Sequence, residues 1–211
     1  MKRKGILVVV SGFSGAGKGT LMKRLLRTYD NYSLSISMTT RAPRPKEQDG
    51  REYFFVTKEI FEKEIKQDGL IEYATYCENY YGTPRKYVEE QLDMGKDVIL
   101  EIEIQGALKI KEKFPTALLL FVMPPTAEEL RKRLTGRGTE TPEVIRKRLS
   151  RAIEEAEGIE KYDFVVINDD LDTCTRELHN LIMSAHNAPF RNEAFIENMR
   201  QELRSLVKGE K

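Results

Sequence analysis

The sequence predicts an α/β fold in which helices flank a parallel β-sheet. Five short apolar runs are spread along the 211 residues, and most are continuous rather than alternating. Continuous apolar runs indicate strands buried on both faces, as in a parallel sheet covered by helices. Helix-like segments separate most of these runs, so strands and helices alternate along the chain. Together these observations favour a doubly wound architecture.

The predicted strands and helices follow one another in a regular order. The strands are ILVVV from Ile6, SLSIS from Ser33, DVILEI from Asp97, ALLLFVM from Ala117 and FVVIN from Phe164. The helices are LMKRLLRTY after the first strand, ALKIKEKF after the third, AEELRKRL after the fourth and ELHNLIMSAH after the fifth. We expect residues 1–36, 93–130 and 151–188 to form the core of the fold.

Two segments interrupt this alternation. Residues 37–92 begin with the Pro- and Arg-rich loop TTRAPRPKEQDG and continue as short strands around one helix-like stretch, KEIFEKEIKQ. This pattern predicts an inserted α+β lobe. Residues 131–150 contain a Gly- and Arg-rich loop that leads into a helix, which predicts a mobile lid. In that helix Thr141 is a candidate N-cap, and Pro142 occupies the first helical position.

Residues 189–211 predict a polar helical extension with only a patchy apolar stripe. The stripe consists of Ala194, Ile196, Met199, Leu203, Leu206 and Val207. We expect this helix to pack on the core or on a partner.

The composition excludes several classes of protein. A net charge of +1 argues against a nucleic-acid-binding protein, which would show a basic excess. No apolar run approaches the length of a membrane span, and the run ILVVV near the N-terminus is better explained as a buried strand than as a signal peptide. We expect a cytoplasmic protein with no membrane partner, either a monomer or a small homo-oligomer. Cys77 and Cys174 lack metal-binding spacing and are expected to be reduced thiols.

The segment SGFSGAGKGTL, from residue 11, carries the strongest motif. Gly12, Gly17 and Lys18 match G-x-x-x-x-G-K directly after an apolar strand and before a helix. This is the context of a phosphate-binding P-loop, so a Gly-rich turn without a ligand is disfavoured. The loop backbone and the helix N-terminus would bind phosphates, and Lys18 can reach the transferring phosphate. The ATP-binding residues predicted here are Gly12, Ser14, Gly15, Ala16, Gly17, Lys18, Gly19 and Thr20.

One position of this motif bears on the metal. Gly19 stands where many P-loops carry a Ser or Thr that contacts Mg²⁺, and Thr20 follows it. The G-K-G-T form resembles that of nucleotide kinases. We expect Mg²⁺ to arrive with ATP and to be held through water or the next hydroxyl, and we assign no protein ligand to the metal.

A second set of motifs lies mainly in the inserted lobe. It comprises S-I-S-M-T-T-R-A-P-R-P-x-E-x-x-G-x-x-Y-x-F-V from Ser35, I-E-Y-A at Ile71, N-Y-Y-G-T at Asn79, L-E-I-x-x-Q-G-A at Leu100, R-G-T at Arg137, K-R-L-S-R-A at Lys147 and V-I-N-D-D at Val166. Over roughly residues 5 to 185 these motifs resemble the guanylate kinase family. The resemblance implies a P-loop nucleoside-monophosphate kinase fold with a GMP-binding lobe and a lid. It also implies transfer of the γ-phosphate of Mg-ATP to GMP, and to dGMP, giving ADP and GDP.

The resemblance implies roles for individual residues. Those of the GMP site are Arg41, Arg44, Tyr53 and Tyr81 for the phosphate, Ser37, Glu72 and Thr83 for the guanine, and Glu103 where the family has Asp. Lys18, Arg137 and Arg148 would form the catalytic set, with Arg133 a weaker candidate and Asn168 near the adenine of ATP. Two guanidinium groups and two phenols suit a phosphomonoester dianion.

Other interpretations stay open. Taken without the resemblance, Tyr53 and Tyr81 could equally belong to the core of the lobe, and Glu72 could be a surface residue. Lys46 stands where the family usually has Gly. A kinase for another monophosphate is disfavoured by the set of polar residues predicted for guanine. A guanylate-kinase-like interaction domain without catalysis typically has a degraded P-loop, whereas the lysine and glycines are intact here.

Overall fold

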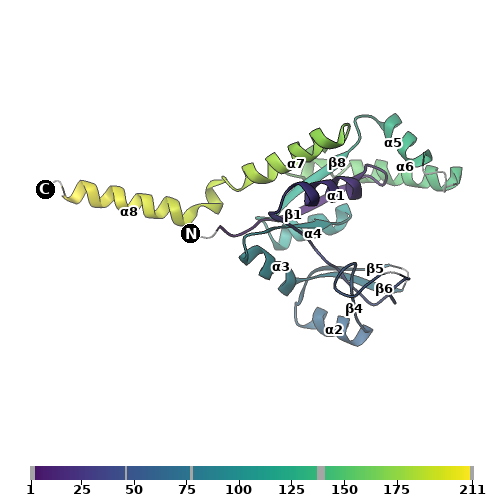
Figure 1. The fold of residues 1–211 in the computed structure, drawn as a ribbon, viewed down its shortest axis with the longest axis horizontal. Helices are drawn as coiled ribbons and strands as arrows, with labels where there is room; N and C mark the ends of the chain where they lie inside the picture. The colour runs from purple at the N-terminus through teal and green to yellow at the C-terminus, as the bar shows by residue number, and fades with distance from the viewer. Residues whose placement is uncertain (1–2, 46, 77, 137–140, 210–211) are drawn as a thin grey trace.

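A five-stranded parallel sheet lies at the centre of the protein. The structure, a computed structural model, describes residues 3–45, 47–76, 78–136 and 141–209. The strands are, in spatial order, β2 (Tyr32–Leu34), β7 (Asp97–Glu101), β1 (Leu7–Gly12), β8 (Leu118–Met123) and β9 (Phe164–Ile167) (Figure 1). In the register of the sheet, Val9 pairs with Leu100 on one side and with Leu119 on the other. The parallel α/β fold predicted from the continuous apolar runs is confirmed.

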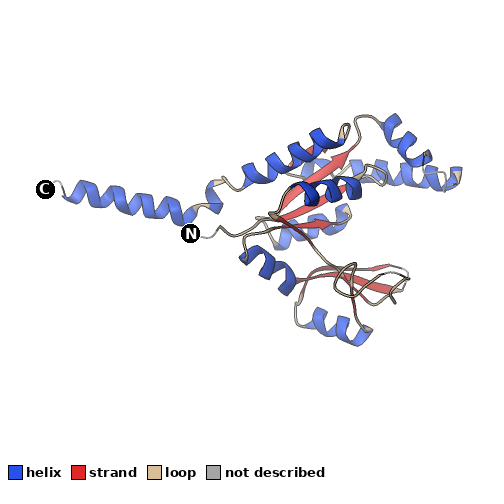
Figure 2. Cartoon of the chain, in the orientation of Figure 1, coloured by secondary structure: helices blue, strands red, loops and turns tan. Residues whose placement is uncertain are grey.

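Helices cover both faces of this sheet (Figure 2). On one face α1 (Lys18–Thr28) packs against α7 (Leu171–Ala185), and on the other α3 (Arg85–Asp93) and α4 (Ile104–Lys113) pack against β7 and β1. The helix α1 contributes apolar side chains at helical spacing, among them Leu21 and Leu25. The β1 side chains between these layers are buried, so the core lies between the two helical layers on the sheet.

The helix α3 was absent from the sequence prediction. Its nine residues, RKYVEEQLD, include only one fully buried side chain, that of Val88. So short a segment with so few apolar residues gives no clear helical period. Because α3 packs on β6 of the lobe as well as on β7 of the core, it connects the two parts. The predicted boundary between residues 92 and 93 falls at the end of this helix.

The inserted lobe has its own four-stranded sheet. In spatial order its strands are β4 (Phe54–Phe55), β3 (Met38–Thr39), β6 (Asn79–Pro84) and β5 (Leu70–Tyr76), with α2 (Lys58–Lys66) packed against them. The Thr57 side chain caps α2 by accepting a hydrogen bond from the Ile60 backbone N–H at 3.4 Å. Phe61 is fully buried beneath the sheet and stacks on Tyr80, with ring centroids 5.1 Å apart.

The predicted lid corresponds to two helices, α5 (Ala127–Thr135) and α6 (Pro142–Ala156). Thr141 caps α6 as predicted, because its hydroxyl accepts a hydrogen bond from the Val144 backbone N–H. The helix runs past the predicted end of the lid at residue 150. No Gly or Pro interrupts the sequence after Pro142 until Gly158, which explains the longer helix.

The C-terminal extension forms α8 (Glu193–Gly209), which points away from both sheets (Figure 1). Two short 3₁₀ helices, η1 (Ile159–Lys161) and η2 (Pro189–Arg191), precede β9 and α8. The apolar side chains of α8 stay exposed, so beyond its first turn the tail does not pack on the core, and packing on a partner stays a prediction. Within the described ranges, no helix combines the length and apolar character needed to cross a lipid bilayer.

Candidate active site

The predicted phosphate-binding loop connects β1 to α1 at the carboxyl edge of the sheet. Gly12 and Gly17 have φ angles of 154° and 89°, which side-chain-bearing residues rarely adopt. A Cβ atom on Gly12 would lie 2.0 Å from the Val122 carbonyl oxygen, and one on Gly17 would lie 2.6 Å from the Asn168 amide nitrogen. Glycine is therefore required at both positions for the loop to take this path.

Lys18 begins α1 and turns back over the loop. Its ammonium group donates hydrogen bonds to the carbonyl oxygens of Gly12, at 2.6 Å, and of Phe13, at 3.2 Å. These contacts hold the positive charge at the mouth of the loop, beside the first backbone N–H groups of the helix. Such a cluster of positive and partially positive groups suits a polyphosphate.

Sequence reasoning gave no role to Glu101, the last residue of β7. Glu101 is exposed, but partial desolvation of its carboxyl raises the pKa of that group, and the positive charge of Lys18 opposes the shift. A carboxylate at this edge of the sheet is thus electrostatically coupled to the loop lysine. The sequence could have indicated this position. In a parallel sheet, a Glu at the carboxyl end of the strand next to β1 lies beside the P-loop.

The helices of the predicted lid bring arginines to the same loop. The Arg148 guanidinium, from α6, donates to the Ser14 hydroxyl at 2.9 Å. Arg133, from α5, donates to the Ala16 carbonyl oxygen at 3.4 Å and to the Glu129 carboxylate at 2.8 Å. The structure therefore brings both predicted arginines to the P-loop, whereas Arg137 lies outside the described residues.

Asn168 lies behind the loop rather than in an open cleft. It follows β9, is almost fully buried, and donates from its side-chain amide to the Ala16 carbonyl oxygen at 2.8 Å. The contact ties the loop to the last strand of the sheet. Proximity to an adenine ring stays a prediction for this residue.

The four residues predicted for the GMP phosphate lie together in the lobe. The Arg41 guanidinium carbon is 5.4 Å from the centre of the Tyr53 ring, and the Tyr53 and Tyr81 rings are 6.0 Å apart. Arg44 belongs to the same Pro-rich loop as Arg41. The two phenols and two guanidinium groups thus come from the loop, the segment before β4, and β6.

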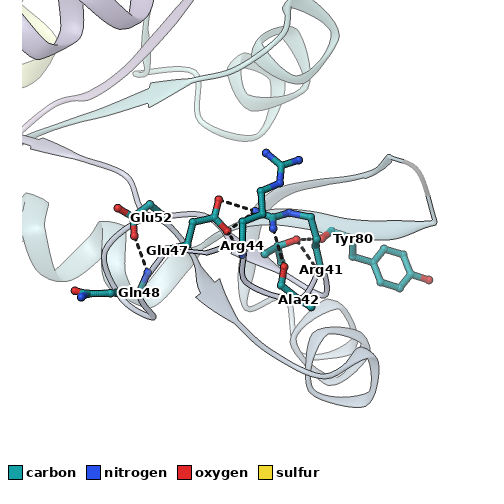
Figure 3. Close-up of polar contacts among 8 residues, drawn as sticks. Arg41, Ala42, Arg44, Glu47, Gln48, Glu52 and Tyr80 are labelled. Carbon is teal, nitrogen blue, oxygen red and sulfur yellow. Dashed lines mark hydrogen bonds and ion pairs between the residues drawn. The ribbon is translucent and has the colours of Figure 1, made fainter.

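Glu47 organises this cluster, and sequence reasoning assigned it no role. Its carboxylate accepts hydrogen bonds from the Arg41 guanidinium at 2.9 and 3.0 Å and from the Arg44 backbone N–H at 2.7 Å (Figure 3). The contact with Glu47 raises the pKa of the Arg41 guanidinium. Bonds from the Arg44 N–H and from Arg41 lower the pKa of the Glu47 carboxyl. Glu47 therefore fixes both the side chain of Arg41 and the turn that carries Arg44.

We expect Glu47→Ala to raise the KM for the acceptor nucleotide at least about tenfold, the scale of one lost charge-assisted hydrogen bond, and to change kcat less. The physical reason is that Arg41 would lose its fixed direction. Steady-state kinetics at saturating ATP measure both constants.

Glu52→Ala is the matched control for this variant. Glu52 is a carboxylate of the same loop that accepts from the Gln48 backbone N–H at 2.7 Å and from Arg51 at 2.6 Å, without contacting Arg41 (Figure 3). Equal effects of the two variants would show that Glu47 only stabilises the loop.

Two of the residues predicted for guanine form a hydrogen-bonded polar pair in which Thr83 is buried and Glu72 is half-buried. The Thr83 hydroxyl donates to the Glu72 carboxylate at 2.7 Å, and Thr83 is inaccessible to solvent. Burial raises the pKa of the Glu72 carboxyl, while the bond from Thr83 and the charge of Lys109 oppose the shift. The third residue, Ser37, is half-buried, and its carbonyl oxygen accepts a hydrogen bond from the Phe54 backbone N–H at 2.9 Å.

The Glu103 side chain contacts helix α6, which belongs to the predicted lid. It precedes α4 and accepts a hydrogen bond from Arg151 of α6 at 2.6 Å. Arg151 also contacts Glu155 at 3.1 Å, so it bridges two carboxylates. The Glu103 side chain is 69% exposed, which leaves its carboxylate accessible to a ligand. Sequence reasoning gave no role to Arg151, although it stands in the motif K-R-L-S-R-A, because spacing does not show that its side chain reaches Glu103.

The site has a P-loop at the carboxyl edge of a parallel sheet. Arginines from the helices α5 and α6 contact this loop. This combination of fold and site defines a P-loop nucleotide kinase, a phosphoryl-transferring enzyme that binds ATP.

Comparison with known proteins identifies the family within this class. The family model described as guanylate kinase matches residues 4–185. The guanylate kinase of Halalkalibacterium halodurans is 48% identical over 200 residues, covering 95% of this chain and 97% of that protein. The guanylate kinase of Oceanobacillus iheyensis is 50% identical over 186 residues, covering 88% and 90%. A crystal structure of guanylate kinase from Anaplasma phagocytophilum matches with a TM-score of 0.69 and 32% identity, covering 90% of this chain and 91% of that one. The chain belongs to the guanylate kinase family.

Proposed function

We propose that this protein transfers the γ-phosphate of ATP to GMP, and to dGMP, giving ADP and GDP. The observation that carries the proposal is the hydrogen-bonded Glu72–Thr83 pair in the lobe, which accompanies an intact P-loop in the core. Guanine presents two adjacent donors, N1–H and the N2 amino group, and an ionised carboxylate can accept from both. The Ser37 hydroxyl would donate to the acceptors O6 or N7, and the Thr83 hydroxyl would do so after turning away from Glu72, to which it donates in the free protein.

The remaining residues have roles in the transfer step. A phosphate oxygen of GMP attacks the γ-phosphorus of ATP, and the bond to the leaving ADP oxygen breaks. Arg41, Arg44, Tyr53 and Tyr81 would hold the attacking phosphate, and the P-loop would hold the donor. Lys18 and the lid arginines Arg137 and Arg148 would offset the charge that spreads over the transferring group. The lid would also exclude water.

Mg²⁺ belongs to the proposal as a partner of ATP. In the part of the chain that the structure describes, His, Cys, Asp and Glu side chains form no group of three or more that could hold a metal ion. A metal carried by the phosphates, which keeps several water ligands, fits such a site. Thr20 and Glu101 are the oxygen-bearing residues suited to contact those waters. When bound, the metal would neutralise negative charge on the phosphates of ATP.

A coupled assay of ADP formation tests the proposal. We expect turnover with ATP plus GMP, slower or comparable turnover with dGMP, and loss of both when EDTA removes divalent metal. GMP binding without any turnover would instead favour an interaction domain of this fold. The cytoplasmic location inferred from the sequence stays a prediction.

The raised pKa of Glu72 predicts a pH dependence of GMP binding. The folded protein without GMP binds the Glu72 proton more tightly than the unfolded chain does. Protonated Glu72 therefore stabilises the folded state at low pH. This contribution to the free energy of unfolding is lost as the pH rises through the folded-state pKa of Glu72. GMP requires the ionised carboxylate. We therefore expect the affinity for GMP to fall on acidification, and the fall to begin at a pH above the usual pKa of a glutamate side chain. Calorimetric titration of wild type and Glu72→Gln separates this effect from protonation of GMP itself, because only the wild type would show it.

Glu103 yields a further expected result. We expect Glu103→Asp to be tolerated and Glu103→Ala to weaken GMP binding, because the carboxylate would contact the base or its waters. Arg151→Ala is the companion variant. It keeps the Glu103 carboxylate but removes the arginine that donates a hydrogen bond to it, so it separates loss of the carboxylate from loss of its position. If Glu103→Ala binds GMP as tightly as wild type in a titration, Glu103 has no place in the GMP site.

A further inference from the structure

A bridge of three charged side chains joins the predicted lid to the acceptor side of the core. The Arg151 guanidinium donates one hydrogen bond to the Glu103 carboxylate at 2.6 Å and another to the Glu155 carboxylate at 3.1 Å. Arg151 and Glu155 belong to α6, whereas Glu103 precedes α4. The bridge therefore connects an element of the lid to a residue predicted to contact guanine.

Glu155 anchors the bridge from within α6. Its side chain is only 11% exposed, against 60% for Arg151. Removal from water raises the pKa of the Glu155 carboxyl, and the nearby charge of Glu103 raises it further, while Arg151 and Lys18 oppose the shift. A buried carboxylate needs a cation close by. Because Glu155 lies one turn beyond Arg151 and accepts from its Nε, it directs the end of the guanidinium toward Glu103.

The same side of α6 also contacts the donor loop. Arg148 lies three residues before Arg151 and donates to the Ser14 hydroxyl at 2.9 Å. Residues three and four apart lie on one side of a helix, so Arg148, Arg151 and Glu155 form one row. A single helix therefore contacts the P-loop through Arg148 and the acceptor side through Arg151.

Glu103 has the chemistry to serve the bridge and the acceptor at once. Arg151 occupies its oxygen Oε2, and an ionised carboxylate accepts hydrogen bonds on both oxygens. The side chain is 69% exposed, which leaves room for a donor from guanine or from its waters. If α6 moved away from the core, Arg151 would leave with it and the carboxylate would lose its fixed position. The position of the lid thus determines how well Glu103 is placed for the acceptor.

We propose that Arg151 is a positioning residue that couples the acceptor site to the donor site, so that GMP and ATP each bind more tightly when the other is bound. This inference rests on the proposed function. A donor nucleotide that favours the contact of α6 with the P-loop also favours the Arg151–Glu103 bond. GMP held by Glu103 favours the same position of α6. Coupling between two sites is reciprocal, so each ligand raises the affinity for the other by the same factor.

Calorimetric titration of the full-length protein with GMP, with and without a saturating non-hydrolysable Mg-ATP analogue, measures this factor. We expect the analogue to raise the GMP affinity of wild type at least about fivefold, the low end of the usual range, because the bond is partly exposed. In Arg151→Ala the factor should fall to within about twofold of one. Arg146→Ala is the matched control and should keep the wild-type factor, since it removes an exposed arginine that pairs with Glu143 of its own helix.

Steady-state kinetics separate this role from a structural one. With both substrates saturating, kcat of Arg151→Ala should stay within about threefold of wild type, because the residue makes no contact that is specific to the transition state. Its KM for GMP at saturating ATP should rise about fivefold or more, since the coupling is lost. A fall in kcat with an unchanged KM would contradict the coupling role.

A double-mutant cycle tests whether Arg151 and Glu103 act through one bond. Glu103→Ala should also remove the coupling, and the double variant should bind GMP, in the presence of the analogue, no more weakly than Glu103→Ala alone. Thermal unfolding of each variant checks the fold. If Arg151→Ala is destabilised because Glu155 loses its partner, Glu103→Ala tests the same bond from its other end.

Two kinds of failure can be told apart in these measurements. A wild type without coupling, coupling that persists in Arg151→Ala, or effects of the two substitutions that multiply would overturn the proposal even where GMP is bound and phosphorylated. A wild type that neither binds nor phosphorylates GMP would refute the proposed function, and this inference with it.

Discussion

The Lys18→Ala variant is expected to lose about a thousandfold in kcat while keeping its fold, the scale of removing a preorganised charge from a transition state. Lys18 is fixed over the loop by bonds to the carbonyl oxygens of Gly12 and Phe13, so its charge needs little reorganisation when the phosphoryl group moves. The negative charge it would offset grows during transfer. For this reason kcat should fall far more than the affinity for GMP.

Lys23→Ala provides the matched control for this variant. Lys23 lies on the exposed side of the same helix, and its removal should leave kcat within about twofold of wild type, as for most surface substitutions. Thermal unfolding and GMP titration of both variants separate catalysis from folding and acceptor binding. A folded Lys18→Ala protein with half of the wild-type turnover would refute the role of this lysine.

The second large effect is expected from Glu72→Gln, which should lower kcat/KM for GMP about a hundredfold or more, because buried polar partners would be mismatched. The amide replaces one acceptor by a donor and would face a guanine N–H group. In the free protein the Thr83 hydroxyl already donates to this side chain at 2.7 Å. The variant should therefore fold, and it should gain little for AMP.

Glu90→Gln serves as the control for this change of charge and hydrogen bonding. Glu90 is exposed on α3, away from the Glu72–Thr83 pair, and its substitution should not affect GMP kinetics. Full GMP efficiency in Glu72→Gln would remove Glu72 from the site and leave a P-loop kinase whose acceptor is unassigned.

The parts of the fold that could be predicted from the sequence are those where one local pattern dominates. β1 and β8 read as strands because they are buried on both faces and hence continuously apolar. The capped start of α6 was visible as Thr141 followed by Pro142. α3 was missed because it is short and polar. The outward direction of α8 could not be predicted, since an amphipathic pattern does not say what covers the apolar face.

The candidate site divides in the same way. The P-loop could be located from motif and context, since all its residues are consecutive. Glu72 could not be identified by periodicity and depended on the family resemblance, because its partner Thr83 belongs to the neighbouring strand. Glu47 stood in a recognised motif, but only the folded loop shows that its carboxylate contacts Arg41 and the Arg44 backbone. Side-chain contacts that depend on a turn are not visible in spacing alone.

The ratio of kcat/KM for GMP to that for AMP, measured with ATP on the wild-type protein, tests the central claim most directly. Adenine would place a ring-nitrogen lone pair against the Glu72 carboxylate and leave this half-buried charge with no donor from the base. Sites of this kind reject the wrong analogue by factors on the order of 10⁴. We predict a ratio of about that size. A ratio below about ten would contradict a guanine-reading pocket built on Glu72, Thr83 and Ser37.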